Sequence, residues 1–200
     1  MKEETRAKIF EHLEAIKELM EEPSQNVEKA ITIDDIQPGT KFTYQDKELV
    51  KLGNEQGGVL CITADLWRTE QCFGDNANYK ESNIKELLEK EFWGKKKDKN
   101  VLDYTMDLTS DNGDDSLGTY TAKVGLLSCD LIRKYYKAIP RYKDWWWTCT
   151  PWAYSSLAGS VRRVYTSGVL NSSLAYDYYG VVPACILDGQ TLISCDSNCK

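Results

Sequence analysis

The chain has 200 residues, 42% of them hydrophobic and 11% aromatic, which is enough for one domain with a sizeable core plus a small appendage. Its formal net charge of -6 argues against a general phosphate-binding surface, so nucleic acid is not an expected partner. No apolar run approaches the roughly 20 residues that span a bilayer, and the charged start lacks the apolar stretch of a signal peptide. We therefore expect no membrane insertion and a protein that is cytoplasmic as synthesised, with a virion as the other setting left open.

Residues 1–29 are predicted to form an amphipathic helix followed by a polar connection. Within 5–22 the apolar residues recur at spacings of 4, 3 and 4, which places one stripe on a helix: Ile9, Leu13, Ile16 and Met20. Pro23 ends this pattern. Because so short a helix needs packing, two uses of the stripe stay open: it joins subunits into a homo-oligomer, or it docks on the domain predicted over 30–200.

The first part of that domain is typical of β-structure. Three runs alternate polar with apolar residues or are apolar throughout: AITIDDI, PGTKFTYQDKELVKLG and GGVLCITADLW. The glycines within residues 54–58 favour a hairpin turn between the second and third runs.

Two helices are predicted in the middle of the chain. Ser82 is expected to cap the first, within YKESNIKELLEKEFWGKK, which Gly94 ends and whose apolar side holds Ile84, Leu87, Leu88 and Phe92. The second lies in SCDLIRKYYKAI, with Pro140 as its stop. After Pro151 we expect short strands and loops, with β segments in VRRVYTS, VVPACIL and TLISC. The class is therefore mixed α+β, and its sheet is predicted to pair mostly antiparallel neighbours.

The chain lacks the residue patterns of common catalytic and cofactor sites. Its single histidine, His12, lies in the N-terminal helix, and both GxGxxG and GxxxxGK[ST] are missing. The acidic stretch TSDNGDDSLG does not keep the order of a calcium loop and has Ala122 where the bidentate glutamate belongs. The cysteines form no CxxC pair, and Cys195 and Cys199 have no neighbouring histidine. We therefore expect no enzyme activity, no cofactor and no metal, with paired carboxylates left open.

Residues 152–180 have the composition of an antibody loop. Five Tyr, six Ser, three Gly and one Asn fill 15 of the 29 positions, against three charged residues. Tyr supplies a large contact area at low entropic cost, and Ser, Gly and Asn supply adaptable hydrogen bonds. The alternative is a Tyr-rich β core. Tyr176, Tyr178 and Tyr179 lie too close together for all to point inward, which favours a recognition surface.

The ligand-binding residues are expected among the outward positions of this segment, because alternate side chains of a strand face outward. They are a subset of Tyr154, Ser155, Ser156, Arg163, Tyr165, Ser167, Leu170, Asn171, Ser173, Tyr176 and Tyr178. A hydrophobic frame is predicted on both sides of them: Trp145, Trp146, Trp147, Pro151, Val181, Pro183, Cys185 and Ile186. Three consecutive indoles alternate faces on a strand, so at least one of the tryptophans is expected in the core.

Five motifs in this order, KESNIKELLEKEF, MDLTSDNG, VGLLSCDLIRKYY, DWWWTCTPW and GVVPACIL, resemble a domain of unknown function common in Gram-positive gut bacteria and their phages. The pattern WWWxxTPW, a variable middle and GVxPAC is similar to the C-terminal variable region of proteins diversified by diversity-generating retroelements. The resemblance covers roughly residues 30–190. Val182 departs from it, since an arginine is usual there, so no role of that arginine carries over. The signatures EPN and WND are absent, so sugar binding through calcium does not follow.

The resemblance implies a C-type-lectin-like domain, of the type shared with formylglycine-generating enzymes, that displays variable residues on a rigid frame. It implies recognition of a protein or cell-surface ligand without catalysis, as a phage receptor binder or a bacterial display protein. Two alternatives stay open. A formylglycine-generating-type enzyme requires a reactive cysteine pair, which is either Cys149 with Cys185 or Cys195 with Cys199. In a structural or assembly subunit of a phage particle, the tyrosines are an intersubunit contact.

Overall fold

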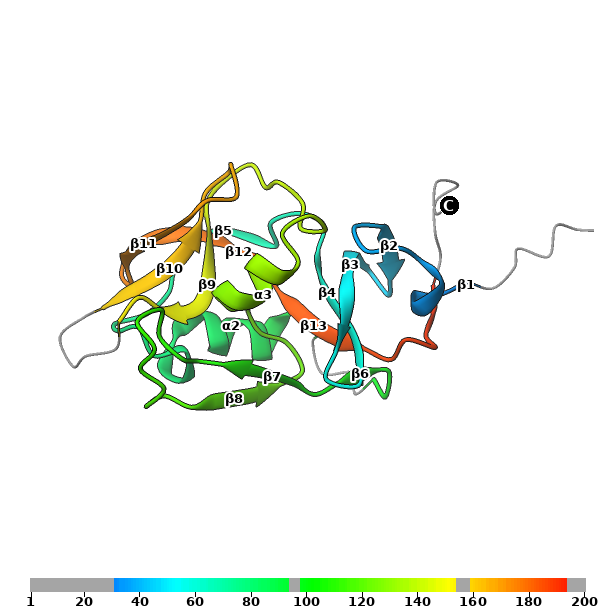
Figure 1. Cartoon of the computed structure of the whole chain (residues 1–200), viewed down its shortest axis with the longest axis horizontal. Helices are drawn as coiled ribbons and strands as arrows, with labels where there is room; N and C mark the ends of the chain where they lie inside the picture. Colours follow the sequence, from blue (N-terminus) through cyan, green and yellow to red (C-terminus); the bar gives the residue numbers. More distant parts are fainter. Residues whose placement is uncertain (1–30, 94–97, 154–158, 194–200) are drawn as a thin grey trace, which may run out of the picture. The chain divides into compact units, whose positions relative to one another are not determined.

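The computed structural model describes residues 31–93, 98–153 and 159–193, which contain two five-stranded sheets, two two-stranded sheets and two α-helices (Figure 1). Most strand pairs are antiparallel, which confirms the α+β class predicted from the sequence. The helix predicted over 5–22, its connection at 24–30 and both terminal cysteines, Cys195 and Cys199, lie outside the described residues.

One five-stranded sheet has the order β2-β3-β4-β13-β6, and all its pairs are antiparallel. The strands are β2 (Lys41–Tyr44), β3 (Lys47–Glu55), β4 (Gly58–Thr63), β6 (Val101–Leu102) and β13 (Ala184–Leu187). The predicted hairpin is confirmed between β3 and β4, where Gln56 and Gly57 have φ of 49° and 82°, as a two-residue turn of this twist requires. The run predicted as a single strand over 38–53 divides into β2 and β3 at a second tight turn, Gln45–Asp46.

The other five-stranded sheet has the order β11-β10-β9-β12-β5 (Figure 1). It carries most of residues 152–180, which we call the late segment. Its strands are β5 (Arg68–Cys72), β9 (Trp146–Pro151), β10 (Ser160–Val164), β11 (Leu170–Leu174) and β12 (Tyr178–Val181). Only the pair of β12 with β9 is parallel in this sheet. After β12 the chain passes through Val182 and Pro183, both buried, into β13 of the first sheet.

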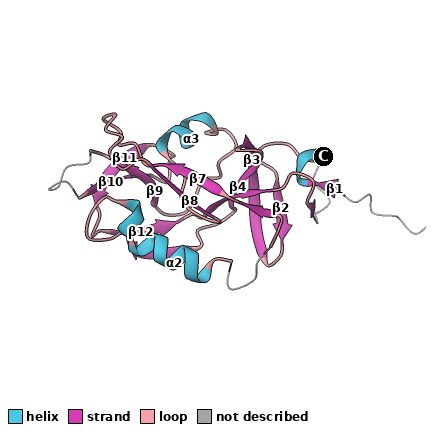
Figure 2. Ribbon diagram, turned by 90° about the horizontal axis from the view of Figure 1, so that it is seen from below, coloured by secondary structure: helices cyan, strands magenta, loops and turns pink. Residues whose placement is uncertain are grey.

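Two short helices lie on opposite sides of the strands (Figure 2). In α2 (Asn83–Glu91) the predicted cap is confirmed, since the Ser82 hydroxyl accepts a 3.0 Å hydrogen bond from the backbone N–H of Lys85. The second helix, α3 (Cys129–Lys134), is shorter than predicted; directly after it, the ring of Tyr135 lies against β3 at Gly53, which has no Cβ to obstruct it. No helix of the described residues has the length and apolarity to cross a bilayer.

The smaller elements border these sheets. One hairpin joins β7 (Tyr104–Asp107) to β8 (Thr119–Ala122) and contains the acidic stretch, and β1 (Ile31–Thr32) pairs with β14 (Leu192–Ile193). Two 3-10 turns, η1 (Ile33–Asp35) and η2 (Tyr79–Glu81), precede β2 and α2.

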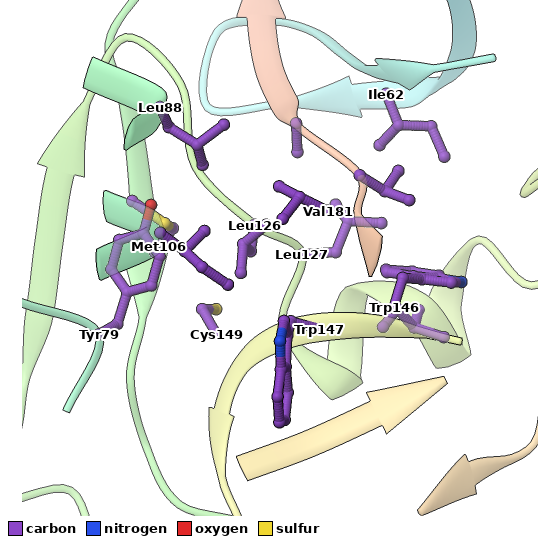
Figure 3. Packing of buried hydrophobic residues seen from close by; sticks show 14 of the residues in the cluster. Ile62, Tyr79, Leu88, Met106, Leu126, Leu127, Trp146, Trp147, Cys149 and Val181 are labelled. Carbon is purple, nitrogen blue, oxygen red and sulfur yellow. The ribbon is translucent and has the colours of Figure 1, made fainter. Parts of the chain in front are cut away.

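Apart from Trp145, which is half-buried, the residues of the predicted hydrophobic frame are buried. Every residue of β9 and of β13 is buried. Figure 3 shows Trp146, Trp147 and Cys149 of β9 among buried side chains that include Leu126, Leu127 and Val181. Residues of β4 alternate between this main cluster and a second one beyond the first sheet, so that sheet is buried on both faces. Truncating an indole in such a core costs about 3–5 kcal/mol, so these tryptophans contribute strongly to the stability of the frame.

Candidate ligand-binding site

Neighbouring strands of the second sheet bring an arginine together with aromatic rings. In the strand register Arg163 of β10 lies opposite Asn171 of β11 and Trp147 of β9. Cross-strand neighbours share one face of a sheet, so these side chains are adjacent. Tyr179 of β12 reaches the same place, since its ring lies 4.9 Å from that of Trp147.

The rings of Trp145, Tyr165 and Tyr179 surround the Arg163 guanidinium, and we call these three residues the aromatic cage. The guanidinium carbon lies 4.0 Å from the ring centre of Trp145, 4.5 Å from that of Tyr179 and 4.6 Å from that of Tyr165. Trp145 also packs edge-to-face on Tyr165, with ring centres 4.5 Å apart at 75°. These distances are those of cation–π contacts, in which the negative faces of the rings attract the cation.

Arg163 is buried without a carboxylate partner. The residue is 6% exposed, and within the described ranges no salt bridge reaches it. Its Nη2 donates to the Tyr165 hydroxyl at 3.4 Å, while Nε and Nη1 have no acceptor among the described residues. A buried cation normally requires a counter-ion. Here the faces of the three rings partly replace the counter-ion, because each cation–π contact contributes about 0.5–2 kcal/mol.

Hydrogen bonds from β11 orient two of the cage rings. The Asn171 amide donates to the Tyr165 hydroxyl at 3.2 Å, and the Ser173 hydroxyl donates to the Tyr179 hydroxyl at 3.0 Å. Small polar side chains of the late segment therefore hold aromatic side chains of the same segment in defined positions.

Two tyrosines close in sequence to the cage residue Tyr179 are strongly exposed. Tyr176 is 60% and Tyr178 64% exposed. The backbone that carries them is held at Ala175, whose carbonyl accepts from the N–H groups of Phe73 and Gly74 at 3.0 and 3.1 Å. Large rings thus face solvent from a chain segment whose backbone is tied to the protein on both sides, since Tyr178 also pairs in the sheet.

Ten of the eleven predicted binding residues divide into three groups, and Leu170 stands apart from them. Arg163, Tyr165, Asn171 and Ser173 belong to one contact network around the cage. Ser167, Tyr176 and Tyr178 are exposed, as expected. Tyr154, Ser155 and Ser156 lie outside the described residues.

Two of the predicted positions differ from an outward placement. Arg163 lies beneath the rings instead of standing out from the sheet, because its charge is stabilised by their faces. Leu170 is half-buried and packs against the main core cluster, because its partner in the register is the buried Val164. The sequence reasoning did not assign Trp145 and Tyr179 to the site. Strand alternation could have signalled Trp145, which shares a face with Trp147.

A separate pocket of about 410 Å³ lies beside the acidic stretch and is lined by none of the cage residues. Its lining includes Ser110, Asp111, Cys129 and Arg133. The Asp111 carboxylate bridges Arg133 at 2.9 Å and Arg162 at 3.4 Å, and is therefore occupied by two cations. Within the described residues, no three His, Cys, Asp or Glu side chains gather as metal ligands would.

The cysteines of the described part are all free thiols: Cys61, Cys72, Cys129, Cys149 and Cys185. Burial raises the pKa of the Cys149 thiol well above its usual range and that of the Cys185 thiol to about 12. Cys149 packs in the main core cluster and Cys185 in the second one. Both are therefore poor nucleophiles near neutral pH.

In comparisons with known proteins, one family matches over the part of the chain that contains the cage. A family described as "Domain of unknown function (DUF6273)" is similar to residues 132–189. This stretch runs from α3 to just beyond β13 and contains Arg163 and all three cage residues. No curated protein matches the chain, and no solved structure does.

Proposed function

We propose that this protein recognises a ligand through the late segment without catalysis. The observation that carries the proposal is the exposure of Tyr176 and Tyr178 on a backbone that is tied to a buried frame. Large rings that are already oriented lose little entropy on binding, and aromatic residues are enriched at binding hot spots. Tyr, Ser and Asn side chains without charges suit contact with a protein or cell-surface ligand.

We propose a C-type-lectin-like scaffold for this surface, as in the variable proteins of diversity-generating retroelements. The motif order, the mostly antiparallel sheets and the two flanking helices support it. In this account β9 and β13 are the constant frame, and the segment between them varies. The setting is a phage receptor binder or a bacterial display protein, and self-association through residues 1–29 raises a weak single-site affinity by avidity.

The buried cysteines weigh against the enzyme alternative. A formylglycine-generating-type enzyme needs two reactive thiols in a cleft, whereas Cys149 and Cys185 are fully buried in different clusters with raised pKa values. The terminal pair lies outside the described residues. Thiol titration with and without copper separates the two functions, since only the enzyme has an acidic, copper-binding pair.

Selection of ligands tests the proposal. The full chain is immobilised and used to select from a displayed random-peptide library and to probe a glycan array. We expect the ligands obtained to lose binding to a Tyr176→Ser/Tyr178→Ser double variant. The matched control is Tyr136→Ser, which removes a ring that is 47% exposed outside the late segment. Ligands that bind all three proteins equally contradict recognition by these tyrosines.

Two further observations separate the settings. A reverse transcriptase gene nearby, with a second copy of the segment that differs only at adenine-templated positions, supports the retroelement proposal. Light scattering tests the assembly alternative. If the Tyr165→Ser/Tyr178→Ser variant dissociates an oligomer while ligand binding persists, the tyrosines form an intersubunit contact.

A further inference from the structure

We infer that Arg163 is the binding point for a carboxylate group of the ligand, an inference that rests on the proposed recognition function and names its ligand chemistry. Arg163 is 6% exposed as a residue, yet within the described part of the chain its Nε and Nη1 atoms have no acceptor. Buried polar groups in proteins are nearly always hydrogen-bonded, so unmet donors on a cation indicate a missing partner. An anionic acceptor supplies both the hydrogen bonds and the counter-charge.

The one hydrogen bond that the Arg163 side chain makes within the described residues is easily exchanged. Its Nη2 lies 3.4 Å from the Tyr165 hydroxyl, beyond the usual range of about 2.7–3.2 Å. A carboxylate oxygen accepts from a guanidinium at about 2.7–2.9 Å and forms a stronger bond. The Tyr165 hydroxyl keeps a donor after the exchange, since Asn171 also donates to it.

The surroundings of Arg163 select a planar monoanion. The cage residues, Asn171 and Ser173 carry no charge, so Arg163 is the cation at the centre of the cage, while Arg141 lies beside Gly168 in the turn after Tyr165. The neighbouring Arg162 is already paired with Asp111. A phosphate dianion requires more positive charge, whereas a carboxylate matches one guanidinium in charge and in planar geometry.

Tyr165 is the ring that gives access. It follows the last residue of β10, at the start of a turn closed by the 2.7 Å hydrogen bond from the Gly168 N–H to its carbonyl. Tyr179 lies within β12 and packs on both Trp145 and Trp147, with ring centres 5.5 and 4.9 Å away. Rotation of the Tyr165 side chain therefore uncovers the guanidinium and leaves two walls of the cage in place.

The test is an NMR titration of the isotope-labelled full chain with sodium acetate, using acetamide and sodium chloride as neutral and ionic-strength controls. We expect saturable shifts of the Arg163 Nε–H and the Trp145 indole N–H with acetate alone. Arg163→Met is expected to abolish saturation, and Arg163→Lys to weaken it by about tenfold, because an ammonium lacks the planar fork. Tyr165→Phe keeps the ring but removes the competing hydroxyl, so acetate is expected to bind it severalfold more tightly.

The source of the carboxylate is tested with N-acetylglycine, which mimics a chain terminus, and glucuronate, which represents an acidic sugar. The tighter of the two identifies the source. Equal shifts with acetate and acetamide, an absence of shifts, or shifts that persist in Arg163→Met overturn the inference. Selected ligands that need Tyr176 and Tyr178, but bind Arg163→Met as well as wild type, contradict this inference alone. Acetate binding at Arg163 without any ligand dependence on those tyrosines contradicts the proposed function instead.

Discussion

The guanidinium carbon of Arg163 lies 4.0 Å from the centre of the Trp145 ring, and no carboxylate of the described residues pairs with it. Arg163 lies in β10 and Trp145 directly precedes β9, the strand that pairs with β10, and both residues lie within the stretch that DUF6273 matches. This pair joins the frame to the segment proposed to bind ligand, so its energetics and those of its neighbours can be tested separately.

We expect Arg163→Met to change the free energy of unfolding by less than about 1 kcal/mol. Removing three cation–π contacts is unfavourable, but removing a buried cation with unmet donors offsets that loss, and the volume is nearly kept. Arg163→Ala is expected to cost about 2–4 kcal/mol, because it also leaves a cavity beneath the rings. Urea denaturation of both variants is the measurement. A loss above about 3 kcal/mol in Arg163→Met is incompatible with an unpaired cation.

Gly180→Ala is expected to destabilise the protein by about 1–3 kcal/mol. A Cβ at this position would lie 3.0 Å from the carbonyl oxygen of Trp145 and 2.6 Å from Leu66, so β9 and β12 would have to separate beside the cage. Gly159→Ala is the matched control, since the nearest atom to its Cβ is 4.0 Å away. Thermal unfolding that ranks both variants equally contradicts this close approach.

The exposed tyrosines are expected to contribute to binding and hardly to stability. Because Tyr176 and Tyr178 are 60% and 64% exposed, replacing either with Ser is expected to change the free energy of unfolding by no more than about 0.5 kcal/mol. Calorimetry of each variant checks this. A large loss in either variant means that the ring packs in the monomer and is not available to a ligand.

The pH dependence of stability is expected to include a contribution from Asp98. The hydrogen bond from the Tyr44 hydroxyl, together with those from the Asn100 N–H and Gln45, lowers the pKa of this carboxyl. A lowered pKa in the folded state gives stability that is present above the unfolded pKa of about 3.9 and is lost as pH falls through the folded value. The stability difference between wild type and Asp98→Asn is therefore expected to shrink below about pH 4. A difference that stays constant down to about pH 2 contradicts the shift.

The buried thiols are expected to be unreactive in the native protein. Burial raises the pKa of Cys61, Cys149 and Cys185, so a neutral-pH thiol reagent is expected to label them only after unfolding. Mass spectrometry of peptides labelled with and without urea locates the modified residues. Rapid native labelling of Cys149 and Cys185 together is the outcome that favours the enzyme alternative.

Local rules predicted much of the fold from the sequence. The Ser82 cap, the β3–β4 hairpin and the buried frame follow from residue type, turn chemistry and alternation. The strand order of the second sheet could not be predicted from the sequence, because β5 and β12 are far apart in the chain and no local pattern encodes their pairing. The burial of Arg163 was missed for the same reason: a charged residue on a strand is normally outward, and here the rings of Trp145 before β9, Tyr165 after β10 and Tyr179 of β12 stabilise it inside.

The central claim is that the late segment, and no other surface, contacts the ligand. Backbone amide NMR mapping of the first ligand selected on the full chain tests it most directly. The account predicts shifts concentrated on β10, β11 and β12, with Tyr176, Tyr178 and the Arg163 side chain among the largest. Shifts confined to the 410 Å³ pocket around Ser110 and Cys129, with the late segment unchanged, would contradict it.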